Sequence, residues 1–567
     1  MWCKDCNIEV NSKTCPICGA TTAEDVPAEI FWCDICYLPV VTSFSAGDKS
    51  ICPLCSGKMR HLSADVRPVF PEERLLLAAL LDKPLGFFMN RSIWALNNRY
   101  YVDGKAMTIS TKFFVESDVN SISKKIFSST TEINYARFDN DVSKFVYANR
   151  YRLALLKEEA NSFVQRTARN FSDERVVISF SGGKDSTVVA DIVTRALNNP
   201  SLVHIFGNTT LEFPTTLAYA ARYRENHPFA IFQSAINDEQ NFFSVCEDIG
   251  PPARMMRWCC SMFKTGPIAR IISSLYRDQK ILTFYGIRKS ESVARSRYNR
   301  VESDAESIKI RQQTVASPIF FWKDADVWLY ILSEKIDFNS AYRLGYDRVG
   351  CWCCPNNNQR AQFLSRVYMP SESKKWRTFL IDFAAKIGKP DPEVYVDSGK
   401  WKARQGGNGL ISANDVKLRF TNCTTEEHAK IYQLTRPFND EFVGLFVPFG
   451  RIAPELGRKI LHETLILDSQ TNVPILSITP FNQGDSVKIK TLNVADHASL
   501  QRMASYQVKK FNACRKCLKC ESICRAGAIS VGERYFIDSS KCVHCKMCVT
   551  PKYLDGGCMM DKFLRTK

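Results

Sequence analysis

Cysteine spacing gives the strongest chemical signal in this 567-residue sequence, which contains 23 cysteines. A CxxC pair brings two thiolates to one metal ion from a tight turn, and two pairs complete a tetrahedral site. Two such sets open the chain, and their cysteines are Cys3, Cys6, Cys15, Cys18, Cys33, Cys36, Cys52 and Cys55. A segment of about 60 residues with few large apolar side chains would not fold without metal. We predict two zinc sites in zinc-ribbon-like knuckles, with a rubredoxin-like iron pair as the alternative.

Two further cysteine runs close the chain. The first run resembles the Cx2Cx2Cx3C pattern of bacterial ferredoxins, although Arg525 replaces the usual proline. In two-cluster ferredoxins the fourth cysteine of each run ligates the other cluster. The resemblance therefore implies one [4Fe–4S] cluster on Cys514, Cys517, Cys520 and Cys558. It implies a second cluster on Cys542, Cys545, Cys548 and Cys524.

The middle of the chain contains a pattern suited to binding phosphate. Residues 176–180 (VVISF) predict a buried parallel strand, which leads into the loop SGGKDS and then a helix. Two glycines permit a tight turn, and the helix N-terminus presents free N–H groups to an anion. Lys184 adds positive charge, and Ser181 and Ser186 add hydroxyl donors. The loop is not a Walker loop, because GxxxxGK[ST] is absent.

Further strands follow this loop. Residues 202–206 predict a second strand, residues 281–288 (ILTFYGIR) another, and residues 324–332 a helix. Ligands bind at strand ends of such sheets, where Arg288, Arg295 and Arg297 could meet phosphates. We therefore predict a multidomain α/β protein whose central Rossmann-like domain has a parallel sheet with helices on both faces.

These motifs resemble the phosphoadenosine-phosphosulfate (PAPS) reductase family of pyrophosphate-loop (PP-loop) proteins. The resemblance rests on the SGGKDS loop, the NTTLEFPTT and GIRKSESVAR segments and the tandem Cys259-Cys260. It implies catalytic roles for Lys184 and Asp185. The nucleotide-binding residues that it implies are Ser181, Gly182, Gly183, Lys184, Asp185, Ser186, Asn208, Thr209, Arg288, Glu291 and Arg295.

Adenylylsulfate reductases of this family also carry a CC…CxxC set that binds a [4Fe–4S] cluster. Cys259, Cys260, Cys351 and Cys354 match that set, which implies a third cluster; zinc or free thiols are the alternatives. Cys353 is left over and is a candidate ligand, catalytic nucleophile or packing residue. Cys246 and Cys423 stand alone and are expected to be core residues.

Patterning suggests five domains. They are two knuckles (1–62), a connecting α/β domain (63–168), a PP-loop catalytic domain (169–415), a small β-rich domain (416–505) and a C-terminal ferredoxin-like α+β module (506–567). Within the connecting domain we expect a turn at Asp103-Gly104 and a helix from about 144 to 168. The sequence does not reveal the role of residues 63–168 or 416–505.

The composition is that of a globular protein, with 45% hydrophobic and 24% charged residues. No apolar run is long enough for a membrane span, and no signal peptide is evident, so we expect a cytoplasmic protein without membrane contact. The formal charge of +17 suggests an acidic partner. A small-molecule nucleotide and an electron-donor protein are the expected partners; nucleic acid, self-association and magnesium stay open.

We favour a sulfonucleotide reductase that acts on PAPS or adenylylsulfate, because fused clusters would supply the electrons that reduction needs. Two features oppose this choice: the ECGxH tail of many reductases is missing, and the loop keeps a complete SGGKDS. The first alternative is an ATP pyrophosphatase that adenylylates tRNA or DNA for sulfur insertion. The second is a non-catalytic, nucleotide-gated redox sensor.

Overall fold

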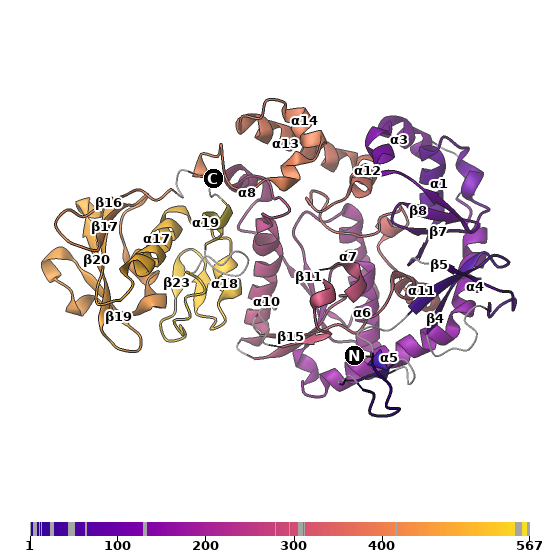
Figure 1. Cartoon of the computed structure of the whole chain (residues 1–567), viewed down its shortest axis with the longest axis horizontal. Coiled ribbons are helices and arrows are strands. Elements are labelled where there is room, and N and C mark those ends of the chain that lie inside the picture. The colour runs from indigo at the N-terminus through magenta and orange to yellow at the C-terminus, as the bar shows by residue number, and fades with distance from the viewer. Residues whose placement is uncertain are drawn as a thin grey trace.

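The structure is a computed structural model of the 567-residue chain, shown in Figure 1. The residues that it describes are 2–3, 8–10, 12, 14–22, 28–43, 51–62, 65–128, 133–277, 279–293, 295–303, 310, 312–413, 417–549 and 558–563. A central α/β unit lies between the N-terminal part of the chain and a C-terminal part that is rich in strands (Figure 1).

The N-terminal part contains two small antiparallel sheets. One pairs β1 (Trp2–Cys3) with β2 (Ile8–Glu9), and the other has the order β4–β3–β5. The strands of the second sheet are β3 (Ala28–Cys33), β4 (Leu38–Ser43) and β5 (Arg60–Leu62). Its buried cluster contains Cys33 and Cys52 together with Leu38, Val40 and Met59. The thiols thus occupy the place of a larger apolar core.

The connecting region combines a four-stranded antiparallel sheet with helices. The strands are β6 (Arg67–Pro68), β7 (Ile93–Leu96), β8 (Arg99–Val102) and β9 (Lys105–Thr108). The helices are α1 (Pro71–Leu80), α2 (Thr111–Glu116), α3 (Val119–Phe127), α4 (Ala136–Ala148) and α5 (Arg150–Ala168). Asp103 and Gly104 join β8 to β9 with φ values of 45° and 80°, which confirms the predicted turn.

The prediction of a single helix from about 144 to 168 is wrong, because the helix is interrupted at Asn149, which separates α4 from α5. The buried Asn149 carboxamide accepts a hydrogen bond from the Val41 N–H (2.6 Å) and donates to the carbonyls of Phe145 (2.8 Å) and Pro39 (3.3 Å). These bonds tie the helices to β4. A tertiary contact of this kind leaves no trace in the periodicity of the helix itself.

The central sheet has the strand order β12–β11–β10–β13–β15–β14. Its strands are β10 (Val176–Phe180), β11 (Val203–Gly207), β12 (Ile231–Ala235), β13 (Ile281–Phe284), β14 (Val301–Glu302) and β15 (Gln313–Ala316). All neighbours pair in parallel except β14, which runs antiparallel along the edge. The strand order reverses between β10 and β13, which is where open α/β sheets bind ligands.

Helices cover both faces of this sheet, as predicted. Ile178, Phe180 and Leu282 share a core with α5, α6 (Lys184–Leu197), α7 (Pro214–Asn226) and α11 (Asp324–Glu334). Val177, on the opposite side of β10, packs with Ile272 of α10 (Gly266–Tyr276). Neighbouring residues of a strand face opposite sides, so an apolar run in β10 serves both layers.

Further helices extend this unit towards the C-terminal part. They are α8 (Phe242–Ile249), α9 (Trp258–Cys260), the π-helical turn η3 (Ser261–Thr265), α12 (Gln359–Tyr368), α13 (Pro370–Lys386) and α14 (Pro392–Asp397). The segment from α9 through η3 to α10 is continuous, so the tandem cysteines lie on the turn that opens α10.

A six-stranded antiparallel sheet follows, in the order β16–β17–β21–β20–β19–β18. The strands are β16 (Phe420–Asn422), β17 (Ala429–Gln433), β18 (Gly450–Ala453), β19 (Thr464–Asp468), β20 (Pro474–Phe481) and β21 (Ser486–Thr491). The boundary predicted at 505 lies inside α17 (His497–Ala513). This helix packs on the sheet and leads directly into the next cysteine run, so the sheet and that run share one core.

The last part of the chain contains a short hairpin and two short helices. These elements are α18 (Lys519–Ile523), β22 (Ile529–Val531), β23 (Tyr535–Ile537) and α19 (Met559–Phe563). Of the helices that the structure describes, none combines the length and the apolar character needed to cross a membrane.

Candidate nucleotide and cysteine sites

The loop after β10 has the geometry of an anion site. The chain turns through Gly182, whose φ is 69°, and a Cβ there would lie 2.8 Å from Cγ2 of Thr216. The Ser186 hydroxyl accepts a hydrogen bond from the Ser181 N–H (3.1 Å) and donates to the Gly183 carbonyl (2.9 Å). These contacts fix the loop and open the N-terminus of α6 at the carboxyl edge of the sheet, where an anion is stabilised.

The loop after β13 lies against this turn. A Cβ on Gly286 would come within 2.6 Å of the Asp185 carbonyl carbon and 2.7 Å of the Ser186 nitrogen. Only glycine permits this backbone approach. The approach places Arg288, two residues later, beside the start of α6.

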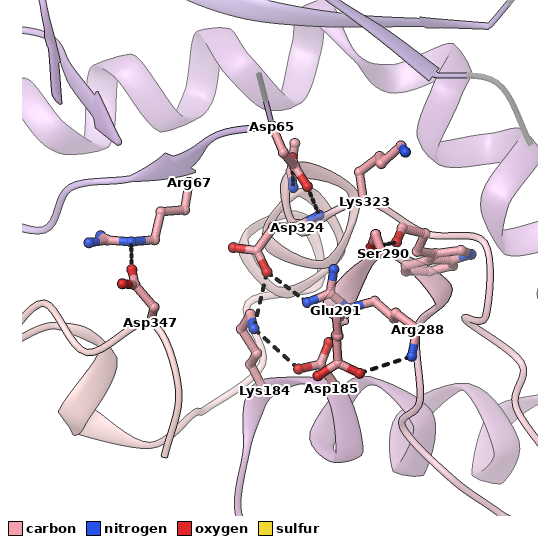
Figure 2. Close-up of polar contacts among 12 residues, drawn as sticks. Asp65, Arg67, Lys184, Asp185, Arg288, Ser290, Glu291, Lys323, Asp324 and Asp347 are labelled. Carbon is pink, nitrogen blue, oxygen red and sulfur yellow. Dashed lines mark hydrogen bonds and ion pairs between the residues drawn. The ribbon is translucent and has the colours of Figure 1, made fainter. Parts of the chain in front are cut away.

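Four buried or half-buried charges join these loops to α11 (Figure 2). Lys184 Nζ lies 3.2 Å from Asp185 Oδ2 and 3.1 Å from Asp324 Oδ1. Arg288 contacts the same two carboxylates, through Nε to Asp185 at 2.5 Å and Nη2 to Asp324 at 2.9 Å. Two cations and two anions therefore form a closed ring of ion pairs at the strand-order reversal.

The ring holds its members charged. Burial alone would raise the pKa of Asp185, but Arg288 and Lys184 lower it to about 2. Burial likewise opposes the charge on Lys184, but Asp185 and Asp324 raise its pKa well above the usual value. An entering phosphate would find two fixed cations and would displace carboxylates from them.

Asp65, which the sequence analysis did not single out, lies beside this ring on its N-terminal side. Its carboxylate accepts hydrogen bonds from the backbone N–H groups of Asp324 (2.7 Å) and Ala325 (3.1 Å), at the start of α11 (Figure 2). Nearby, Arg67 pairs with Glu73 and Asp347, both at 2.7 Å, and this anchors the segment. Burial, and then the charge of Asp324, raise the pKa of Asp65 to about 6.

Tyr342 and Asn339 also reach the loop without having been predicted. The Tyr342 hydroxyl accepts a hydrogen bond from the Lys184 N–H (3.0 Å), and Asn339 Nδ2 donates to the Gly182 carbonyl (3.2 Å). Both residues follow α11 by a short segment. Both residues are more than 150 positions from the loop in the sequence, so no local pattern could reveal them. Asp324 did have a local signal, because it is an acidic residue at the start of a helix that follows a strand.

The other residues that the family resemblance implied lie around the same edge. Glu291 accepts a hydrogen bond from the Arg288 N–H (3.0 Å) and forms an ion pair with Arg295. Thr209 bonds to Glu212 through its N–H (3.0 Å) and its hydroxyl (2.8 Å). Asn208 caps the same turn by accepting from the Thr210 N–H (2.9 Å). Their roles in binding nucleotide stay predictions.

The segment after β11 connects this edge to the cysteines of the central domain. Cys351 forms an isolated antiparallel bridge with Glu212, and its sulfur lies 3.5 Å from the Thr209 hydroxyl. Cys259 neighbours Cys260 and Cys351, and a hydrogen bond with Cys260, together with burial, raises its pKa. That hydrogen bond, together with the Arg257 guanidinium 3.4 Å away, lowers the pKa of Cys260.

Cys354 lies close enough to affect both Arg257 and Cys351 electrostatically, so the structure brings Cys259, Cys260, Cys351 and Cys354 together. Cys353 points into the core instead, where it is 3% exposed. Burial raises its pKa well above the usual value, and a thiol that stays protonated is a weak nucleophile. The geometry favours packing for Cys353. Cys246 is likewise fully buried, whereas Cys423 is partly exposed rather than a core residue.

The N-terminal thiols are spaced as one metal ion requires. Cys33, Cys36, Cys52 and Cys55 have sulfurs within 4.8 Å of one another, including 3.5 Å for Cys33–Cys55 and 4.0 Å for Cys36–Cys52. A tetrahedral zinc with bonds of 2.3 Å separates its sulfurs by about 3.8 Å. Cys3, Cys15 and Cys18 form a similar group, and Cys6 lies outside the described residues. The spacing of the sulfurs in each group suits one metal ion.

The C-terminal thiols lie in one region, where Cys548 is near Cys520 as well as near Cys524 and Cys542, so the crossed sets that the resemblance implied stay predictions. Burial and then the neighbouring thiols of Cys520, Cys558 and Cys514 raise the pKa of Cys517. The other four, Cys524, Cys542, Cys545 and Cys548, line one pocket. A [4Fe–4S] cluster is held by four thiolates, and the resemblance to ferredoxins assigns four of these cysteines to each of two clusters. That they bind such clusters stays a prediction.

The first of these sets packs directly against the central domain. A single apolar cluster contains Cys353, Met262 and Phe263 on one side and Cys517 and Cys558 on the other, with Cys259 and Cys351 packed against it. Gly266 of α10 meets Leu518, whose Cβ would lie 2.8 Å from an added Cβ. Arg270 pairs with Glu521 at 3.3 Å and donates to the Val531 carbonyl (2.7 Å). Helices α10 and α18, which carry these residues or adjoin them, are adjacent in Figure 1.

Comparison with known families supports the family resemblance of the central domain. Residues 175–357 match the family described as the phosphoadenosine phosphosulfate reductase domain. Adenosine 5'-phosphosulfate reductase of Staphylococcus epidermidis is 23% identical over 234 residues, which are 40% of this chain and 87% of that protein. The central domain is thus PAPS reductase-like, whereas the knuckles and the ferredoxin-like module lie outside the matched residues.

Two uncharacterized proteins of Methanocaldococcus jannaschii match a longer part. They are 30% and 26% identical over 298 and 269 residues, 53% and 47% of this chain. The chain spans about three fifths of their length, at 58% and 61%. Among solved structures, a PAPS reductase from Candida auris aligns with 36% of this chain and 97% of its own, with 16% identity and a TM-score of 0.28. The tRNA thiolase NcsA of Methanococcus maripaludis aligns with 47% of this chain and 87% of its own, with 15% identity and a TM-score of 0.22.

Proposed function

We propose that the chain is a reductase of a sulfonucleotide, PAPS or adenylylsulfate, which receives electrons through its C-terminal cysteine module. The observation that carries the proposal is the apolar cluster that contains thiols of both the central domain and the first C-terminal set. Reduction of a sulfonucleotide to sulfite consumes two electrons, so a redox module packed on the site would supply what the reaction needs. When bound, clusters of this kind transfer electrons one at a time.

The nucleotide phosphate would bind at the loop after β10. Lys184 and Arg288 are the buried cations there, and both are already oriented by Asp185 and Asp324. Fixed charges in a buried site stabilise developing negative charge without reorganisation. The first role of this site is therefore to hold the nucleotide while bond cleavage places charge on its phosphate.

The sulfonate group would face the cysteines of the central domain. Arg257 lies beside Cys260, and its positive charge together with that of Lys264 lowers the pKa of Cys260. Burial raises the pKa of Cys351, and Lys264 opposes that rise. A sulfonate is an anion, so Arg257 and Lys264 could pair with it next to the thiols. Thr209 links the two halves, because its hydroxyl contacts Cys351 while its N–H holds the turn after β11.

The complete SGGKDS loop supports the alternative of ATP-dependent adenylylation. Asp185 faces both cations of the ring and would be a ligand for a magnesium ion that accompanies a pyrophosphate. Sulfonucleotides have no β,γ-pyrophosphate, so a reductase would need this carboxylate only to orient Lys184 and Arg288. The packing of the C-terminal thiols has no evident use in adenylylation, which transfers no electrons.

Anaerobic product analysis decides between the two functions. The reduced, iron-replete protein is offered adenylylsulfate, PAPS and ATP in separate reactions, and sulfite, AMP, adenosine 3',5'-bisphosphate and pyrophosphate are quantified. Sulfite with the matching nucleotide supports the reductase. AMP and pyrophosphate from ATP without sulfite would reject it in favour of adenylylation. Nucleotide binding without any product would support the redox sensor.

A further inference from the structure

A groove in the β-rich domain is separate from the nucleotide and cysteine sites. It lies between β16, β17 and the first turns of α17 and encloses a volume of about 660 Å³. Ligand sites typically have volumes of about 300 to 1,000 Å³. The side chains that line it include Phe420, His428, Lys430, His497, Gln501 and Arg502.

Gln501 gives this groove an unsatisfied acceptor. The residue is 7% exposed, and its amide nitrogen donates to the Tyr432 hydroxyl (2.8 Å) and the Ile489 carbonyl (3.4 Å). A carbonyl can only accept, so the amide nitrogen must face Ile489 and the amide oxygen must face away from it. That oxygen is buried without a hydrogen-bond partner. A buried acceptor left unpaired costs free energy, which an N–H or O–H group of a ligand would recover.

Flat rings line the same groove as Gln501. The imidazoles of His428 and His497 are stacked, with centroids 3.8 Å apart and planes 6° from parallel. The Thr491 hydroxyl lies 2.7 Å from His497 Nδ1 and fixes the inner ring. Phe420, which is 46% exposed, also lines the groove, with the Lys430 ammonium 4.4 Å from its centroid. A planar heteroaromatic ring could stack here while its N–H edge meets Gln501.

The charges at the groove suit a phosphate attached to such a ring. Lys430 and Arg502 line it, and the carboxylate of Glu426 is paired with Lys488 and with Lys490 at 3.1 Å. Glu427 is the remaining acidic lining residue, and it is exposed to solvent. Stacking, an N–H acceptor and nearby cations are together the elements that recognise a nucleotide.

We propose that this groove binds a nucleotide, either free or as an unpaired residue of an RNA strand, through base stacking on His428 and an N–H bond to the Gln501 amide oxygen. Every nucleobase carries an N–H on its pairing edge, so this contact accepts more than one base. The proposal does not depend on the reaction at the SGGKDS loop. It assigns a second, non-catalytic nucleotide site to residues 418–505.

The full-length protein, kept anaerobic, is titrated with a fluorescently labelled single-stranded RNA 12-mer and, separately, with cytidine monophosphate and ribose 5-phosphate. Gln501→Leu removes the acceptor, and Arg502→Ala removes an exposed cation without touching the core. Lys459→Ala is the matched charge control, because this exposed lysine lies outside the groove. Lys184→Ala tests for binding at the SGGKDS loop.

Binding of RNA that falls at least tenfold in Gln501→Leu and in Arg502→Ala, but not in Lys459→Ala or Lys184→Ala, supports the site and identifies a strand as its source. The same dependence for cytidine monophosphate without RNA binding supports a free nucleotide. Three results overturn the proposal: no binding of either probe, equal binding of ribose 5-phosphate, or binding that is unchanged in Arg502→Ala and Gln501→Leu. Loss only in Lys184→Ala would assign the binding to the SGGKDS loop and also overturn it.

Discussion

Both ends of the chain are rich in cysteine, but they hold their sulfurs differently. At the N-terminus the sulfurs of Cys33, Cys36, Cys52 and Cys55 approach within 4.8 Å of one another. At the C-terminus the described thiols form no group that close; instead, four of them surround a pocket. The sequence motifs differ as well: the N-terminal cysteines form separated CxxC pairs, whereas the first C-terminal run has the spacing Cx2Cx2Cx3C. The motif and the arrangement of the sulfurs therefore both distinguish the two regions.

The two regions also differ in what they contact. The N-terminal sulfurs pack with their own strands and with Ala148 of α4, far from the nucleotide loop in the chain. Cys517 and Cys558 pack with Met262 and Phe263 of the central domain. We therefore expect metal at the N-terminus to support folding and metal at the C-terminus to support turnover.

The largest effect is expected from Cys517→Ser. This change removes one predicted ligand next to the central domain, so the protein should lose about four iron atoms, keep its zinc and lose sulfite formation. Iron and zinc are measured by elemental analysis, and electron paramagnetic resonance of the reduced protein measures the signal of the reduced clusters. Cys423→Ser is the control, because this partly exposed thiol belongs to none of the sets. Full iron content in Cys517→Ser would disprove the assignment.

Cys36→Ser should have the opposite metal signature. It removes one of four sulfurs in a segment whose small core depends on them, so about one zinc should be lost and the segment should become sensitive to protease. Iron content and the paramagnetic signal should not change. Loss of iron in this variant would mean that the N-terminal thiols hold iron, which was the alternative prediction for these knuckles.

Lys184→Ala should lower turnover about 100-fold while iron stays constant, because a buried cation at the phosphate is lost. Steady-state sulfite formation measures the effect. Arg195→Ala is a suitable control, because this arginine lies near the far end of the same helix and is half exposed. Unchanged turnover in Lys184→Ala would exclude the loop from the reaction.

Gly266→Val tests the contact between the central domain and the C-terminal cysteine module without removing any thiol. A Cβ at this position would lie 2.8 Å from the Leu518 Cβ, so the bulkier side chain must push α18 away from α10. We expect sulfite formation to fall about tenfold with iron retained, since electron transfer weakens with distance. Ser273→Val, on an exposed position of the same helix, should be silent. Equal rates in both variants would show that this contact does not carry electrons.

Local patterns in the sequence predicted the N-terminal thiol groups and the loop well, because their residues are near one another in the chain. The SGGKDS turn, the strand before it and the helix after it all appear as expected. The ring of ion pairs was only partly visible in the sequence, since Asp324 reaches Lys184 and Arg288 from another element, and Asp65 binds the backbone of that element. The break at Asn149 was missed for the same reason: its cause is a hydrogen bond to β4.

The smallest effect concerns Asp65, whose raised pKa of about 6 makes the ring sensitive to pH. The folded protein keeps a proton that the unfolded chain, with a pKa of 3.8, releases, so this residue's contribution to stability declines as pH rises towards 6. Above that pH the negative charge of the Asp65 carboxylate, beside Asp324, attracts Arg288 more strongly and repels a phosphate. Adenylylsulfate, which does not titrate in this range, should bind several-fold more weakly at pH 7.5 than at pH 5.5. Asp65→Asn should abolish the difference in calorimetric titrations, and a difference that persists in this variant would assign the pH dependence to another group.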